Sequence, residues 1–169
     1  MVNTVNSLKK FGDKMNAASK ILLGILCAVL TVIVIAQVLV RLFFNFNFTW
    51  VEELSIHLFI WQTMIGSAVA TKYLGHIGVD VVVNKLPHKI KRGVQIVAYL
   101  FLIGTMVLFG ITGFQFMLSQ STQYAVTIHY SMLMIYISVP LGCAMMIYHA
   151  TVQLLELIFI GEIEVPENI

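Results

Sequence analysis

The residues of this chain that could do chemistry are histidines and carboxylates set in or beside long apolar stretches. His57 and His149 lie within such stretches, and two imidazoles that face each other inside a helical bundle can bind haem iron. Glu52, Glu53 and Asp80 could carry protons, since acids within a membrane commonly serve ion or proton pathways. The elements that position these side chains decide between the two chemistries.

Neither chemistry fits the spacing well. His57 falls about one turn inside one end of its apolar stretch, whereas His149 falls near the opposite end of its own, so the two imidazoles are expected at different depths. No acid falls in the middle of an apolar stretch. A haem-b membrane anchor and a stand-alone proton-coupled exporter therefore stay as alternatives only.

Other reaction classes find no support in the sequence. It contains no HExxH, no GxSxG, no phosphate-binding loop and no Cys/His ligand set. Its basic residues flank apolar stretches, which is typical of a membrane surface and not of nucleic-acid binding. We expect no enzyme activity, no cofactor or metal and no nucleic-acid partner.

The composition predicts an integral membrane protein. Of 169 residues, 59% are hydrophobic and only 11% are charged, whereas a water-soluble domain carries about 25% charged residues. The length suits a single membrane domain, residues 1–169, of about four crossings. Both cysteines lie in apolar runs and are expected to pack rather than to form a disulfide.

The uncharged stretches place the crossings. Residues 21–40 carry no charge, and no Asp, Glu, Lys or Arg occurs between Arg92 and Glu156, a run long enough for two helices joined at the polar segment 119–123. A surface lead-in over residues 1–20 precedes the first crossing, and Pro140 is expected to kink the last. The four transmembrane helices are predicted at about residues 17–43, 50–73, 89–118 and 128–158.

A short amphipathic helix is predicted between the second and third crossings, at about residues 77–86. Its apolar positions recur at helical spacing and Pro87 ends it, so it should lie in the membrane interface. Its apolar side is Val79, Val82, Val83 and Leu86, and its polar side is His76, Asp80 and Asn84.

The basic residues predict the orientation. The N-terminal arm has four Lys and residues 72–92 have five Lys or Arg, whereas the other side has Arg41 alone. Because cytoplasmic segments carry the excess of Lys and Arg, both termini are expected in the cytoplasm.

Residues 48–80 hold the most specific pattern in the chain. Glu53, His57 and Trp61 recur at helical spacing on one face, and Gly66 and Ala70 follow as small residues that allow another helix to approach closely. Glu52 and Glu53 begin the helix, where the helix dipole favours acids. Arg41, the only basic residue on that side, is the expected ion-pair partner of either acid.

This stretch resembles the small membrane subunit of tripartite ATP-independent periplasmic (TRAP) transporters, the DctQ family. The resemblance covers the whole chain in length and helix count and the second quarter in specific motifs. The residues that carry it are Trp50, Glu52, Glu53, Trp61, Gly66, Ala68, Lys72, His76, Ile77, Val79, Asp80, Leu86 and Pro87.

The resemblance implies a role in the bacterial inner membrane. In this family a periplasmic binding protein captures an organic acid, and a large membrane subunit transports it with sodium ions. The small subunit is a scaffold that enlarges the large subunit and helps dock the binding protein, and it holds no substrate or sodium site. The chain is also similar to the sialic-acid members, so sialic acid (N-acetylneuraminate) is the first expected substrate, followed by C4-dicarboxylates.

Overall fold

The computed structural model describes residues 2–74 and 88–159, and most of these lie in helices. The helices are α1 (Val2–Phe44), α2 (Thr49–Leu74), α4 (His88–Ser119), α5 (Leu133–Tyr136) and α6 (Ser138–Phe159). Within these ranges, four spans are long and apolar enough to cross a membrane: Ser7–Phe44, Thr49–Tyr73, Arg92–Ser119 and Leu133–Phe159. The prediction of an all-helical membrane protein with four spans is confirmed.

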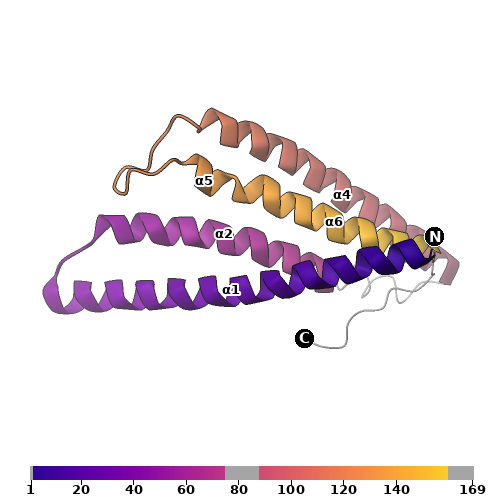
Figure 1. Ribbon diagram of the computed structural model, residues 1–169, viewed down its shortest axis with the longest axis horizontal. Helices are drawn as coiled ribbons and strands as arrows, with labels where there is room; N and C mark the ends of the chain where they lie inside the picture. The colour runs from indigo at the N-terminus through magenta and orange to yellow at the C-terminus, as the bar shows by residue number, and fades with distance from the viewer. Residues whose placement is uncertain (1, 75–87, 160–169) are drawn as a thin grey trace.

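The long helices lie side by side in the order α1, α2, α6 and α4, so that α2 and α6 occupy the middle (Figure 1). We call the end of the bundle that holds the connections following α1 and α4 the turn end. We call the opposite end the N-terminal end; it holds the start of α1, the start of α4 and the end of α6 (Figure 1). α2 and α6 both run from the turn end to the N-terminal end.

The first helix begins at Val2, and the predicted surface lead-in over residues 1–20 is instead its first part. The backbone hydrogen-bond ladder has no reason to stop between these segments, because no proline occurs in α1. Asn16 and Ser19 are buried there, and a Cβ placed on Gly12 would lie 3.3 Å from the ring of Tyr148 in α6. The early part of α1 therefore packs against the bundle.

The fourth span begins later than residue 128 and is broken. The chain before Leu133 forms a tight loop, closed by a hydrogen bond from the Ala125 N–H to the Tyr130 carbonyl (2.9 Å), and His129 adopts a positive φ of 55°. Ile137 separates α5 from α6. Pro140 then lies in the first turn of α6, where its missing N–H costs little, so the proline marks a break and not a mid-helix kink.

The core lies between α2, α4 and α6. Ala68 of α2 packs with Cys143 and Met146 of α6, and all three are buried. Towards the N-terminal end, Tyr99 of α4 packs with a second buried group of α6: Ala150, Leu154 and Leu157. By contrast, none of the most apolar stretch of α1 is buried within the chain. The predicted helix at 77–86, with His76 and Asp80, lies outside the described residues.

Gly142 gives a test of this packing. A Cβ at this position would lie 2.9 Å from Cβ of Met64 and 3.3 Å from its carbonyl oxygen, so α2 and α6 approach closely here. We expect Gly142→Ala to destabilise the protein by about 1–3 kcal/mol, the usual cost of overpacking. Thermal unfolding in detergent measures the change. The matched control is Gly104→Ala, because nothing lies within 4 Å of that position; an equal loss in both variants would contradict the predicted contact.

Candidate functional site

The predicted face of α2 is used inside the chain, at the turn end. The carboxylate of Glu53 accepts hydrogen bonds from the backbone N–H groups of Val126 and Thr127, both at 2.9 Å. One turn on, His57 forms a hydrogen bond through Nδ1 with the hydroxyl of Tyr130, and their rings meet edge to face at 5.4 Å. This helix face thus holds the loop between α4 and α5.

Trp61 completes the same face. Its indole Nε1 donates to the carbonyl of Met134 in α5 (3.2 Å), and Met64 one turn further packs against Gly142. The helical spacing read from the sequence therefore placed these side chains together. Trp50 lies in the first turn of α2, about half exposed, with its ring against Phe48 at 6.2 Å.

The expected ion pair of Arg41 with Glu52 or Glu53 does not form among the described residues. Glu52 instead accepts from the side-chain amide of Asn47 (2.9 Å), which in turn accepts from Gln37 (3.2 Å). The Glu53 carboxylate binds the loop amides instead, and the Arg41 side chain is exposed in the last turn of α1. Two backbone N–H groups provide a fixed, convergent partner for a carboxylate, which a long exposed arginine does not.

The two histidines of the spans do not face each other. Met64 of α2 and Gly142 of α6 lie at the same level, and His57 and His149 are each seven residues from this level, in opposite directions. At 1.5 Å per residue about 20 Å separates them along the bundle. This separation is too large for both imidazoles to bind one iron, so the geometry gives no support to the haem anchor.

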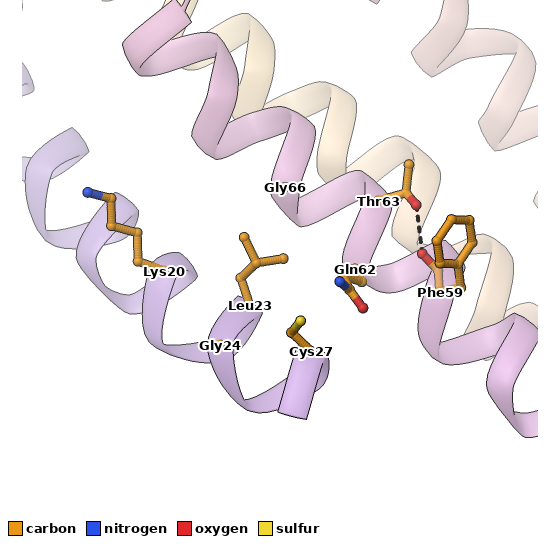
Figure 2. A pocket seen from close by; sticks show the side chains of 8 residues that line it. All are labelled: Lys20, Leu23, Gly24, Cys27, Phe59, Gln62, Thr63 and Gly66. Carbon is orange, nitrogen blue, oxygen red and sulfur yellow. Dashed lines mark hydrogen bonds between the residues drawn. The ribbon is translucent and has the colours of Figure 1, made fainter. Parts of the chain in front are cut away.

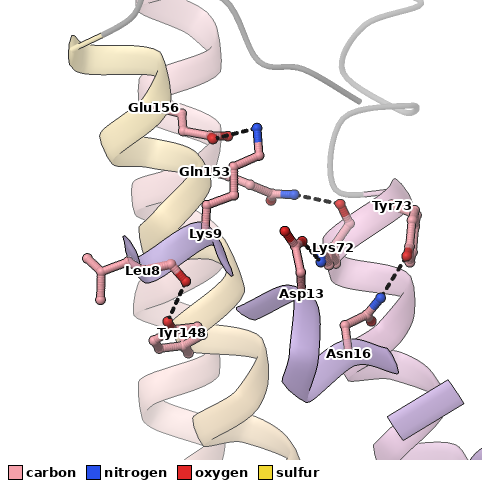
Figure 3. Close-up of polar contacts among 9 residues, drawn as sticks. All are labelled: Leu8, Lys9, Asp13, Asn16, Lys72, Tyr73, Tyr148, Gln153 and Glu156. Carbon is pink, nitrogen blue, oxygen red and sulfur yellow. Dashed lines mark hydrogen bonds and ion pairs between the residues drawn. The ribbon is translucent and has the colours of Figure 1, made fainter. Parts of the chain in front are cut away.

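Polar side chains gather at the N-terminal end, where they link three helices (Figure 3). Lys9 of α1 pairs with the buried Glu156 of α6 at 3.0 Å, and Asp13 of α1 pairs with Lys72 of α2. The Tyr148 hydroxyl of α6 donates to the Leu8 carbonyl at 2.9 Å.

Gln153 is the central member of this cluster. Its amide nitrogen donates to the Lys72 carbonyl at 2.6 Å, and its amide oxygen accepts from the Tyr99 hydroxyl of α4 at 3.3 Å. Asn16 of α1 donates to the Tyr73 hydroxyl at 2.7 Å. The cluster therefore ties all four long helices at one end and satisfies the Lys72 carbonyl in the last turn of α2.

Between the two ends, α1 and α2 leave an apolar groove of about 520 Å³ (Figure 2). Gly66 lies here, facing Leu23 of α1 at 3.6 Å from its Cβ position, and Ala70 is partly buried one turn on. The residues that line the groove are Lys20, Leu23, Gly24, Cys27, Phe59, Gln62, Thr63 and Gly66.

Sequence reasoning missed Gln62. Its amide oxygen is covered and has no hydrogen-bond partner in the described part of the chain. The signal that could have identified Gln62 is its polar amide in the middle of the second crossing, which is otherwise mostly apolar. Sequence reasoning also missed Gln153 and Glu156, whose partners come from other helices.

Four helices that are long and apolar enough to cross a membrane define a small multi-pass membrane protein. It has polar clusters at its two ends and an open groove between them. Residues 30–159 match the family model of the tripartite ATP-independent periplasmic transporters, DctQ component. The chain therefore belongs to the DctQ family.

Three curated relatives agree with this assignment. The chain is 28% identical over 89 residues, 53% of its length and 38% of the relative's, to the C4-dicarboxylate TRAP transporter small permease protein DctQ of Vibrio cholerae. It is 34% identical over 80 residues, 47% of its length and 50% of the relative's, to a putative TRAP transporter small permease protein of Haemophilus influenzae. It is 38% identical over 60 residues, 36% of its length, to the sialic acid TRAP transporter permease protein SiaT of Haemophilus influenzae.

The coverage of these relatives is partial. The aligned segments span 38% and 50% of the two small permease proteins. In SiaT the aligned segment is only 10% of the whole, so a region similar to this chain is joined there to a much longer polypeptide.

The hydrogen bonds of Glu53 predict that the loop between α4 and α5 is held rigid. Glu53→Gln removes the charge and leaves one acceptor for the two N–H groups, so the amides of Val126 and Thr127 should exchange with deuterium several-fold faster. Hydrogen exchange read by mass spectrometry measures this rate. Glu52→Gln is the control, because that side chain contacts Asn47 and not the loop; unchanged exchange in Glu53→Gln would refute the contact.

The polar cluster predicts a loss of stability on truncation. Gln153→Leu leaves the Lys72 carbonyl without its donor and the Tyr99 hydroxyl without this acceptor, at a cost of about 1–3 kcal/mol. Unfolding in detergent measures it. Thr151→Val serves as the control, because the Thr151 hydroxyl donates only within its own helix, to Ile147. Equal stability of Gln153→Leu and the unaltered protein would count against this cluster.

Proposed function

We propose that this chain is a non-catalytic scaffold subunit of a TRAP transporter, which braces a large membrane subunit that carries the substrate. The observation that carries the proposal is the family match over residues 30–159. The partner follows from SiaT, where a segment similar to this chain belongs to a polypeptide of much greater length. In the proposed complex, the four spans of this chain pack side by side with such a partner in the membrane.

The placement of charge supports bracing over conduction. In the described spans, ionised side chains lie near the two ends, where Lys9 pairs with Glu156 and Asp13 pairs with Lys72. Ionisable side chains inside membrane spans commonly mark the path of an ion or substrate. Those near the N-terminal end are Lys9, Lys10, Asp13, Lys14, Lys20, Lys72, Arg92 and Glu156, and those near the turn end are Arg41, Glu52 and Glu53.

The same reasoning disfavours a stand-alone proton-coupled exporter. That function needs an acid in a water-filled path through the membrane. Glu53 is held by two loop amides at the turn end, and Glu52 lies exposed beside Asn47. Neither carboxylate is placed to relay a proton to the opposite end.

We further propose that the protein lies in the bacterial inner membrane with both termini in the cytoplasm, as the excess of Lys and Arg near the N-terminal end indicates. The turn end then faces the periplasm. The loop that Glu53 and His57 hold exposes Tyr124 and Val126 there, and it is suited to help dock a periplasmic binding protein.

The contact with the large subunit is proposed on the apolar surfaces that the chain leaves open. Most residues of α1 between Ile21 and Phe44 are exposed, and Trp50 and Gly66 lie on the adjoining helix. We also propose Ala70 and the 76–87 segment with His76 and Asp80 as members of this interface.

The substrate is proposed to be an organic acid taken up with sodium ions. Sialic acid is the first candidate and C4-dicarboxylates follow, since relatives of both names match the chain. Selectivity would reside in the other subunits, because the groove of this chain is apolar and lacks the cationic side chains at mid-membrane that a carboxylate ligand requires.

Reconstitution tests the function. In proteoliposomes that have the binding protein and its substrate outside and an inwardly directed sodium gradient, uptake should need both this chain and its large subunit, and it should fall to background when either is omitted. Labelled sialic acid and labelled succinate are the two substrates to compare. Uptake by this chain alone, or full uptake by the large subunit alone, would refute the scaffold function.

A further inference from the structure

Two ion pairs fix the level of the first part of α1 relative to the membrane (Figure 3). Lys9 pairs with Glu156, which lies in the last turn of α6, and Asp13 pairs with Lys72, which lies in the last turn of α2. The spans of α2 and α6 end within a turn of these partners. The stretch of α1 from Lys9 to Asp13 therefore lies where the neighbouring spans leave the membrane, which is the level of the lipid headgroups.

Lys10 and Lys14 place two positive charges at this level. They lie one turn apart on the same face of α1, and both side chains are exposed. Gly12 and Ser19, which are buried against the bundle, lie on the opposite face. Among the described residues neither lysine forms an ion pair, and Asp13, the acid beside them, is already paired. The two charges are therefore open to a partner from outside the chain.

The surface around the two lysines is apolar. The Phe11 side chain, next to Lys10, is 62% exposed, and further along the same face Ile21 and Ile25 are 67% and 55% exposed. These isoleucines lie within the uncharged run 21–40, on the hydrocarbon side of the lysines. A pair of cations at the headgroup level with apolar side chains directly below it matches the two parts of an anionic phospholipid, its phosphate and its acyl chains.

We propose that Lys10 and Lys14 form a binding site for the headgroup of an anionic phospholipid, whose acyl chains lie beside Ile21 and Ile25. Lipid is favoured over an acidic protein segment because the headgroup layer surrounds this level of the bundle on every exposed side. In the orientation proposed above, the site lies in the cytoplasmic leaflet, whose surface is negative. The site needs no large subunit, so it does not depend on the scaffold function.

Lipid titration of the purified full chain tests the site. In native mass spectrometry, phosphatidylglycerol should bind more tightly than zwitterionic phosphatidylcholine. Joint substitution Lys10→Gln and Lys14→Gln should weaken phosphatidylglycerol binding tenfold or more, because each basic residue near a membrane surface contributes about fivefold. Lys10→Arg with Lys14→Arg keeps both charges and should bind like the unaltered chain. Arg41→Gln is the matched control, because Arg41 is an exposed cation at the turn end; it should leave this affinity unchanged.

Photo-crosslinking locates the lipid. Phosphatidylglycerol with a photoreactive group in its head should label the segment of α1 around residues 10–14, both in the chain alone and in its complex with the large subunit. Equal affinity for the two lipids, or unaltered phosphatidylglycerol binding in the double glutamine variant, would overturn the site. Labelling that is lost when the complex forms would assign the lysines to a protein contact and would overturn it as well. These outcomes leave the scaffold function untouched, since uptake tests that function separately.

Discussion

The close approach of α2 to α6 at Gly142 is the contact on which the rest of the structure depends. Because α6 has no side chain there, the Met64 side chain and backbone of α2 can lie directly against it. This contact sets the level of the two central helices. With that level fixed, Glu53 and His57 reach the loop at one end, and Gln153 reaches the Lys72 carbonyl at the other.

The membrane determines where the polar contacts lie along the bundle. Hydrocarbon offers no hydrogen bonds, so paired polar side chains gather at the two ends and apolar packing fills the interior. At the turn end the Glu53 carboxylate accepts hydrogen bonds from two loop amides. At the N-terminal end two ion pairs and the side-chain hydrogen bonds of Asn16, Tyr99, Tyr148 and Gln153 join the helices. Gln62 departs from this arrangement, because it lies between the two ends and its Oε1 is covered and unpaired among the described residues.

The bundle is unevenly covered. α6 is packed between α2 and α4, whereas the most apolar stretch of α1 is not buried within the chain at all. In a soluble protein such a surface would cause aggregation, but in a membrane it can face lipid or another subunit. A chain that keeps its ionised groups at its ends and leaves one side open is suited to extend a larger transporter.

The sequence by itself determined the four spans, their order and the face of α2 that carries Glu53, His57 and Trp61, because hydropathy and helical periodicity are local properties. It did not determine that α1 continues back to Val2, or that the fourth span is broken at Ile137. The partner of Glu53 lies more than seventy residues away, and the predicted pair with Arg41 does not form among the described residues because complementary charge does not fix which groups meet in space. Only the tertiary structure decided such pairings, since they depend on which helices pack together and at what level. The unpaired amide of Gln62 became visible for the same reason: a side chain lacks a partner only relative to its neighbours in space.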